Sequence, residues 1–236
     1  MNNVKLLIIS SCTKKKQFSK INQPNWDNLS SKESKIKFLK AFYSESCKAI
    51  DMYKGQQHKM IIEGIQILKK YFEVDFFIIS AGFGLLHQDE IIPCYESSFR
   101  DKNRSQIIER SNQLEIMSDF IKLLSKNYDL IYLALGKKYL ISIYDWEKYI
   151  KSLTIAFIPS INSNVLSLKS NNEVVIGLKS SGYKIHGTIG LKGDLLKIIA
   201  EKLLKFNNPA QTLYEITRNK TALKGFINDQ IYGFWN

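Results

Sequence analysis

The sequence is poor in the residues that cross-link a chain or anchor it in a membrane. Its three cysteines and three histidines show neither Cys-x-x-Cys nor His-x-x-x-His spacing, so we expect no disulfide framework and no metal site. Four prolines and twelve glycines exclude collagen-like and low-complexity chains. No apolar run approaches the ~20 residues of a membrane helix, and the run near the N-terminus is too short for a signal-peptide core. These absences favour a cytoplasmic protein without metal, organic cofactor, membrane contact or obligate protein partner.

Acidic residues are also scarce. Aspartate and glutamate number 22 against 34 lysines and arginines, which gives a formal net charge of +12 and a pI near 9.4. A basic chain with 12% aromatic residues suits a polyanionic partner, and we expect nucleic acid, with DNA favoured over RNA. A lysine-rich codon bias would give the same charge, because isoleucine and asparagine are also abundant. A concentration of the charge on one face would favour the first explanation.

Four short apolar runs predict the central strands of one sheet. Each run is nearly continuous in large apolar residues and ends in small, glycine or polar residues, as buried parallel strands do. Helical patterns separate the runs, so the sequence predicts a three-layer α/β fold with a mainly parallel four-stranded sheet and helices on both faces. The predicted strands are residues 4–10, 75–80, 130–135 and 153–158. Ligands bind outside the carboxyl ends of such strands, so we expect the four following loops to converge on one crevice.

The helical periodicity also indicates how the chain divides. The predicted helices are residues 35–53, 59–71, 106–125, 139–149 and 193–206, and residues 211–227 form a small helical unit. The stretch 160–193 is rich in Ser, Asn and Gly, and we expect a long loop or flexible β element that closes over the crevice. Asn208-Pro209 interrupts the pattern. The predicted domains are therefore an α/β domain over residues 1–206 and a helical appendage over residues 207–236.

Basic, hydroxyl and amide side chains follow three of the predicted strands. The first loop combines hydroxyls with a lysine triplet that could hold phosphate, although it lacks the GxxxxGK[ST] pattern of a Walker loop. A Gly-Lys-Lys turn follows the third strand, and a Pro-Ser-Ile-Asn-Ser-Asn stretch follows the fourth. The expected phosphate or DNA contacts are Ser11, Cys12, Thr13, Lys14, Lys15, Lys16, Lys137, Ser160 and Ser163, and Asn162 is an expected base contact. Ordinary solvated turns would explain the same residues.

Residues 80–96 combine glycines, aromatics and acids in a way that suits a base pocket. Two glycines beside a phenylalanine permit a tight backbone next to a flat aromatic face. The expected base contacts are Ser80, Gly82, Phe83, Gly84 and Tyr95, and the expected catalytic carboxylates are Asp89 and Glu96. A carboxylate in this place could orient water or stabilise a sugar cation. The alternative is a glycine-shaped turn that packs Phe83 into the core and leaves the acids in solvent.

Two segments resemble known proteins. Residues 80–86 (SAGFGLL), followed by acids and then by Ile92-Pro93-Cys94-Tyr95, resemble the S-(A/G)-x-(Y/F)-G-(L/V)-L…P-Y core of the YaaA peroxide-stress family and its uncharacterised relatives. Residues 11–16 (SCTKKK) resemble the SC-x-KK start of those relatives, and domains of archaeosine-synthesis enzymes carry a similar strand and basic loop.

The order of the strands is similar to that of the uracil-DNA glycosylase superfamily. Ile158-Pro159-Ser160 resembles its last catalytic loop, but Ile158 stands where that family usually has a histidine, and the Gly-Gln-Asp-Pro-Tyr loop is missing. Uracil is therefore a poor substrate. Together the resemblances imply an α/β protein that binds DNA or RNA and acts on a modified base.

Three functions fit these features. The first is a glycosidase that hydrolyses the N-glycosidic bond of a flipped, modified base in DNA, which would suit defence against phages with modified DNA. The second is a deazaguanine-modifying enzyme with Cys12 or Cys94 as its nucleophile. The third is a DNA-binding protein without catalysis, as the YaaA resemblance allows. His87 and His186 are further candidates for an acid or a base, although a lone histidine is more often a hydrogen-bonded bystander.

Overall fold

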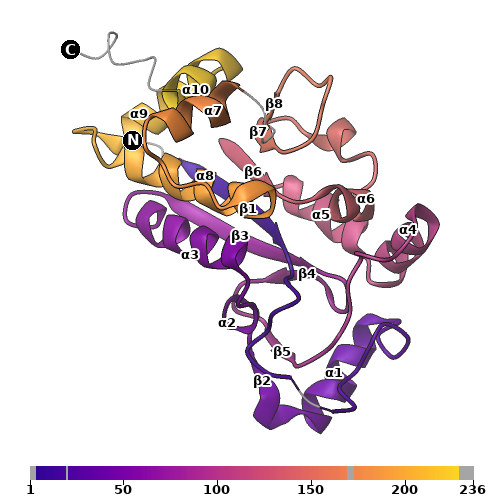
Figure 1. The fold of residues 1–236 in the computed structure, drawn as a ribbon. Helices are drawn as coiled ribbons and strands as arrows, with labels where there is room; N and C mark the ends of the chain where they lie inside the picture. Colours follow the sequence, from indigo (N-terminus) through magenta and orange to yellow (C-terminus); the bar gives the residue numbers. More distant parts are fainter. Residues whose placement is uncertain (1–3, 20, 169–172, 229–236) are drawn as a thin grey trace.

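A six-stranded sheet forms the centre of the computed structural model, which describes residues 4–19, 21–168 and 173–228 (Figure 1). Its strand order is β4-β3-β1-β6-β7-β8, and among the described strands of this sheet only β4 runs antiparallel to its neighbour. The strands are β1 (Lys5–Ser11), β3 (Glu73–Ser80), β4 (Gly84–His87), β6 (Leu130–Ala134), β7 (Leu153–Ala156) and β8 (Val165–Ser167). The predicted α/β class is confirmed, and each of the four predicted strands is present.

Two short strands at the edges of the sheet lie outside the prediction. β4 folds back on β3 directly after a tight turn, with Gly84 opposite Ser80. β8 lies parallel to β7 within the stretch 160–193, which also contains α7 (Glu173–Ser180). Strands of three or four residues are too short to show a periodicity of their own, so the sequence pattern does not reveal them.

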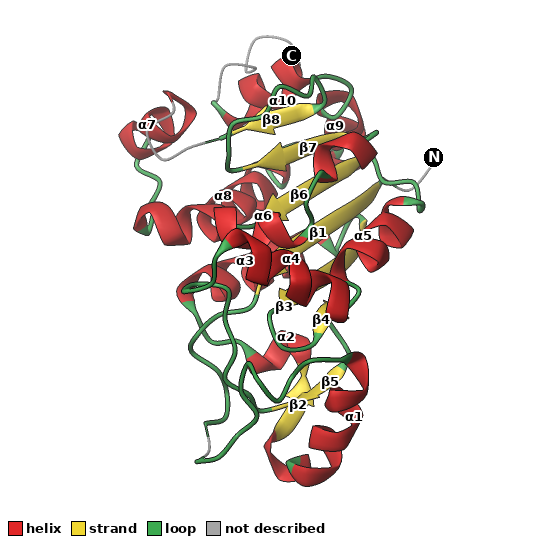
Figure 2. Ribbon diagram, turned by 90° about the vertical axis from the view of Figure 1, so that its right-hand side faces the viewer, coloured by secondary structure: helices red, strands yellow, loops and turns green. Residues whose placement is uncertain are grey.

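Helices cover both faces of the sheet. α3 (Gln56–Leu68) and α8 (Gly187–Leu203) lie side by side on one face (Figure 1). α4 (Arg104–Gln113), α5 (Ile116–Leu124) and α6 (Lys137–Ser142) lie on the other face, which is turned to the viewer in Figure 2. β1 lies in the middle of the sheet, and residues 6–10 are buried because both faces are covered.

Three of the helices predicted from the sequence are wrong as continuous helices. Residues 35–53 form the end of α1 (Lys32–Ala41), η1 (Tyr43–Glu45), β2 (Ser46–Lys48) and α2 (Ala49–Met52). The helix is interrupted because β2 pairs with β5 (Ile91–Pro93), a partner distant in sequence. Residues 106–125 form two helices, α4 and α5, separated at Glu115, whose φ is 54°. The predicted helix 139–149 likewise ends early in α6 and continues as η2 (Trp146–Tyr149).

The C-terminal helices share the core of the sheet domain. α9 (Pro209–Ile216) and α10 (Lys220–Ile227) bury Leu213, Leu223 and Phe226 in the same apolar cluster as the central strands. Lys202 of α8 also donates a hydrogen bond to the carbonyl oxygen of Ile227 at 2.6 Å. The domain division near residue 207 stays a prediction, and residues 229–236 of the predicted appendage lie outside the described part of the chain. Among the helices that the structure describes, none has the length and apolar character to cross a membrane.

Gly84 offers a test of the turn that starts β4. Its φ is +84°, and a Cβ added there would lie 2.8 Å from the carbonyl oxygen of Leu114. Gly84→Ala should therefore lower the free energy of unfolding by about 2–4 kcal/mol, through left-handed strain plus a backbone clash. Gly182→Ala is the matched control, because Gly182 has a φ of +85° but no neighbour within 4 Å of the added Cβ. Urea unfolding measures both, and equal losses would contradict the packing of this turn.

Candidate functional site

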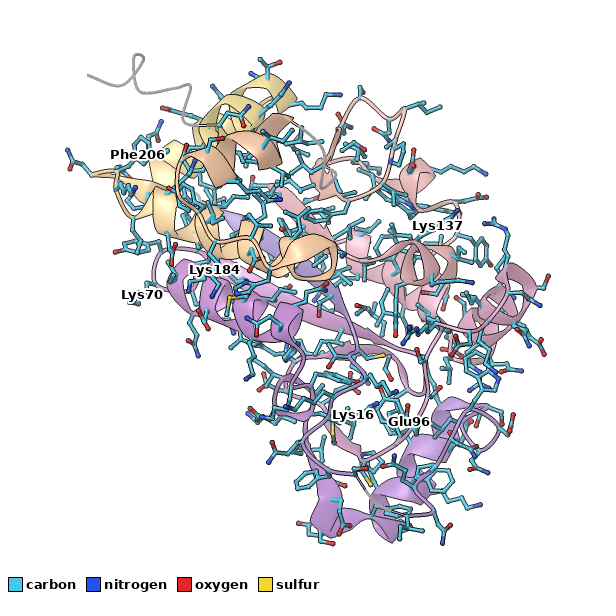
Figure 3. All side chains as sticks on the ribbon, viewed as in Figure 1. Lys16, Lys70, Glu96, Lys137, Lys184 and Phe206 are labelled. Atoms are coloured by element: carbon cyan, nitrogen blue, oxygen red, sulfur yellow. The ribbon has the colours of Figure 1, made fainter. Side chains whose placement is uncertain are left out.

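The loops after β1 and β3 meet at the carboxyl end of the sheet. The backbone N–H of Cys12 donates to the carbonyl oxygen of Ile79 at 2.9 Å. The segment after β5 also reaches this edge, because the Lys16 ammonium of the loop after β1 lies 4.0 Å from Oε2 of Glu96, and Figure 3 shows the two residues side by side. The segment after β6 joins them, since Sγ of Cys12 lies 2.9 Å from the hydroxyl of Tyr139. The predicted convergence is confirmed for these three loops.

A group of buried polar side chains, which we call the polar cluster, holds the three loops together. Its members are Cys12, Lys16, Tyr53, Ser80, Tyr95 and Tyr139. Ser80 donates to the Tyr95 hydroxyl at 2.9 Å, and that hydroxyl lies 2.8 Å from the hydroxyl of Tyr53. Ser80 Oγ in turn accepts from the backbone N–H groups of Gly82 and Phe83. The cluster therefore satisfies its hydroxyls internally, as buried polar groups require.

Lys16 is the unusual member of the polar cluster. Its side chain is only 4% exposed, whereas Lys14 and Lys15 are exposed. The ammonium lies 4.4 Å from the centre of the Tyr95 ring, a cation–π contact that gains strength when water is excluded. The backbone of Lys16 also pairs with that of Tyr53, which directs the side chain inward. The expectation that Lys16 contacts phosphate from the surface is therefore wrong.

Six further basic side chains lie on the segments that carry the polar cluster. We call Lys14, Lys15, Arg100, Lys102, Lys137 and Lys138 the basic rim. In the described residues, no carboxylate lies within ion-pair distance of these six side chains. Lys138 donates to the carbonyl oxygen of Lys102 at 2.5 Å, which ties the start of α6 to the loop before α4. These cations thus come from three segments of the chain, and the Lys102 ammonium lies 4.5 Å from the centre of the Trp26 ring.

Residues 11–16, which we call the lysine loop, also contain side chains whose contacts fix the backbone of the loop. Oγ1 of Thr13 donates to the carbonyl oxygen of Lys15 at 2.8 Å and accepts from the N–H of Gly55 at 3.3 Å. Ser11 ends β1 and is half-buried. Cys12 is buried. Of the residues 11–16 predicted to bind phosphate, Lys14 and Lys15 are the ones whose side chains are exposed at the surface.

The aromatic residues predicted to stack on a base are not exposed. Phe83 is 4% exposed and Tyr95 is fully buried, and their rings pack edge to face with centres 4.8 Å apart. Gly82 serves this packing, because a Cβ there would lie 2.7 Å from Cδ1 of Leu29 and 2.9 Å from the Tyr95 ring. Gly84 supplies the left-handed turn. An open stacking face in this segment is therefore contradicted, and a base could reach it only through a movement of the loop.

Asp89 lies away from the polar cluster. β4 runs antiparallel to β3, so the chain moves away from Ser80 as it continues, and His87 lies opposite Phe77. The carboxylate of Asp89 accepts a hydrogen bond from Lys48 at 2.8 Å, and that bond lowers the pKa of Asp89. Of the two predicted catalytic carboxylates, the structure brings only Glu96 to the polar cluster.

The loop after β7 also does not lie with the other three loops at the carboxyl end of the sheet. β8 is parallel to β7 and adjacent to it, so the connection must return to the level at which β7 begins. Oγ of Ser160 donates to Glu147, and the amide of Asn162 donates to the carbonyl oxygen of Glu147, both at 2.9 Å. Ser163 is exposed on the same return segment. The prediction that this loop joins the other three is wrong.

Two members of the polar cluster are absent from the sequence prediction. Tyr53 follows α2, in a segment that the sequence pattern assigns to a helix. Tyr139 lies two residues after Lys137, directly behind the predicted Gly-Lys-Lys turn. Its closeness to the end of a predicted strand could have identified it as a site residue. In the described residues no three His, Cys, Asp or Glu side chains gather in a way that could hold a metal ion.

Comparison with known proteins adds one finding. A model described as a family of unknown function, DUF6884, matches residues 39–156, which is half of the chain. The matched segment contains Tyr53, Ser80, Tyr95 and Tyr139 of the polar cluster, as well as Glu96, but begins after the lysine loop. No curated protein matches the sequence.

Alkaline titration tests the burial of the cluster tyrosines. Burial raises the pKa of Tyr53, Tyr95 and Tyr139 well above the ordinary value of 10. Below pH 10 these phenols are protonated in both states, whereas above it ionisation favours the unfolded chain, so native stability falls as the pH rises. Tyrosinate absorbance of the native protein should lag behind that of the protein in concentrated urea and then rise together with unfolding. If the titration curves of the native and the urea-unfolded protein coincide, the burial of these three tyrosines is contradicted.

Proposed function

The chain belongs to DUF6884, a family of unknown function, and we propose that this protein binds DNA at the carboxyl end of its sheet and hydrolyses the N-glycosidic bond of a modified base. One observation carries the proposal. A buried ammonium, Lys16, is held between the Tyr95 ring and the Glu96 carboxylate, and it follows the exposed Lys14 and Lys15 in the same loop. Such an arrangement combines a phosphate-binding surface with a carboxylate that can act on a sugar.

The basic rim supports the binding step. Phosphate contacts by lysine and arginine need no particular sequence and place the backbone of the nucleic acid against the protein. Lys14 and Lys15 extend from one loop, and Lys137 and Lys138 extend from the start of α6. The hydrogen bond between Cys12 and Tyr139 holds these two segments in a fixed relation. In the proposal, both segments contact the phosphate backbone of one bound nucleic acid.

Glu96 supports the chemical step. Its side chain is 52% exposed, so water and a sugar can reach the carboxylate. In the proposed reaction the carboxylate takes a proton from water as the water oxygen bonds to C1′, while the bond from C1′ to the base nitrogen breaks. The negative charge of Glu96 and of the bound phosphates stabilises the positive charge that develops on the sugar. No metal ion or organic cofactor enters this step.

Binding without catalysis is a second candidate. The observation that favours it is the burial of Phe83, Tyr95 and Lys16, which leaves no exposed ring for an extruded base in this segment. The deazaguanine alternative finds less support, because Cys12 and Cys94 are both buried. We place the protein in the cytoplasm, where its three cysteines, which form no disulfide, would stay reduced. Defence against phages with modified DNA is the role that the first candidate suits.

Salt dependence tests the binding surface. The double variant Lys14→Gln, Lys15→Gln should weaken DNA binding and make the slope of log affinity against log salt less negative by about 2, since each lost phosphate contact contributes ~0.9. Lys122→Gln, Lys126→Gln is the matched control. It removes the same charge from α5 and the turn behind it, where Lys126 lies near Asp75 at the opposite end of the strands. An equal change of slope in both variants would contradict the proposed surface.

Glu96→Gln tests the chemical step. With DNAs that carry a range of modified bases, wild-type protein followed by alkali should give strand breaks at abasic sites, and the variant should be slower by at least about 100-fold. DNA affinity should stay within about 2-fold, because Glu96 contacts no phosphate in the proposal. Asp89→Asn is the control and should keep the wild-type rate. Strand breaks with neither enzyme would leave binding alone as the function, and equal rates of E96Q and wild type would remove Glu96 from the mechanism.

A further inference from the structure

A half-buried tryptophan, Trp26, lies in the segment between β1 and α1, directly beside the backbone of Glu96. The backbones of Asn25 and Glu96 form a bridge, and the N–H of Glu96 donates to the carbonyl oxygen of Pro24 at 2.8 Å. The indole remains partly exposed, whereas Phe83 is buried. This segment therefore brings an aromatic ring that solvent can reach to the residue proposed to act on the sugar.

Arg110 of α4 supports the indole from inside the protein. Its guanidinium carbon lies 4.0 Å from the centre of the Trp26 ring, and its two terminal nitrogens donate to the carbonyl oxygens of Trp26 and Leu29. Arg110 is 4% exposed, so the protein fixes its position. The buried ring of Phe99 packs edge to face against the indole, with centres 6.0 Å apart. The Trp26 ring is thus held in place before any ligand binds, which lowers the entropic cost of binding.

Lys102 places a second cation against the same ring. Its ammonium lies 4.5 Å from the ring centre, and in the described residues no carboxylate lies within ion-pair distance of it. The carbonyl oxygen of Lys102 accepts from Lys138, so the backbone here is tied to the start of α6 while the side chain is not. A compact ammonium on a flexible stem can leave the ring for a phosphate and still stay close to it.

An aromatic ring beside cations has the two features that single-stranded nucleic acid requires. Every base has a face that can stack on an aromatic side chain, and lysine or arginine contacts the phosphates between the bases. Arg100, in the same loop as Lys102, adds a further cation of the basic rim. An acidic peptide would use only the cations, whereas a nucleotide uses both the ring and the cations. The arrangement around Trp26 therefore favours a nucleotide.

We propose that Trp26 is the platform on which a base of the bound nucleic acid stacks, and that Lys102 moves from the ring to a phosphate of the same strand. This inference rests on the DNA binding of the proposed function and is independent of the hydrolysis. It supplies the reachable ring that residues 80–96 lack. Because Asn25 pairs with Glu96, a strand stacked on Trp26 is held next to the segment that carries this carboxylate.

Two single-stranded oligonucleotides of equal length separate stacking from charge. One is oligothymidylate of about 12 nucleotides, and the other has the same sugar-phosphate backbone without bases. Trp26→Ala should weaken the binding of oligothymidylate by about 10-fold or more and change the binding of the base-free strand by less than about 2-fold. Tyr71→Ala is the matched control and should change neither affinity. Tyr71 is 46% exposed and precedes β3, at the opposite end of the strands.

Lys102→Gln should weaken the binding of both strands and make the slope of log affinity against log salt less negative by about 0.7, the value for one phosphate contact on a single strand. Trp26→Ala should leave that slope unchanged, because stacking releases no counterions. In wild-type protein, oligothymidylate should quench the tryptophan fluorescence and the base-free strand should not. Trp26→Phe keeps a ring, so it should lose this quenching but bind oligothymidylate more tightly than Trp26→Ala.

The outcomes separate the stacking role from the proposed function. An equal loss of affinity for both strands in Trp26→Ala would show that the ring only holds its loop, and would overturn the stacking role. Wild-type affinity for oligothymidylate in Trp26→Ala would also overturn it, while DNA binding would stand. Wild-type protein that binds neither strand would overturn the proposed DNA binding and the stacking role together. A selective loss for the strand with bases supports stacking, whether or not the protein releases a base from any DNA.

Discussion

The buried ammonium of Lys16 is the interaction on which the arrangement of this edge depends. A cation without solvent is costly unless its surroundings compensate, and here the Tyr95 ring and the Glu96 carboxylate do so. Lys16 belongs to the loop after β1, whereas Tyr95 and Glu96 belong to the segment after β5. The contact therefore joins two segments that are distant in the sequence. The contact links the lysine loop to Tyr95 and Glu96, and the hydrogen bonds of Ser80, Tyr53 and Tyr139 hold the rest of the cluster.

The sequence pattern predicts the inner part of the fold well and its edges poorly. The central strands read as uninterrupted apolar runs, such as residues 75–80, because helices cover both of their faces. β2, β4, β5 and β8 have three or four residues each, and their existence depends on partners distant in the chain. Helix predictions fail for the same reason. The predicted helix 35–53 is interrupted because β2 pairs with β5, which is distant in the sequence.

For the candidate site, too, the sequence predicts some positions and not others. The meeting of residues 11–16 with residues 80–96 follows from parallel neighbouring strands, whose carboxyl ends share one edge. The position of Asp89 does not follow, because it depends on the reversal of the chain at Gly84. The direction of the Lys16 side chain also escapes prediction. Three adjacent lysines look alike in a sequence, and the pairing of Lys16 with Tyr53 decides which one turns inward.

The most direct test of the central claim is the reactivity of these three lysines in the folded protein. An acylating reagent at low concentration, followed by mass spectrometry, gives the rate at each ammonium, and Lys14 and Lys15 serve as internal standards. The 4% exposure of the Lys16 side chain predicts that Lys16 reacts many times more slowly than its two neighbours, and that the difference disappears in urea. If Lys16 reacts as fast as Lys14 and Lys15 in the native state, the contact between the two loops does not exist as described.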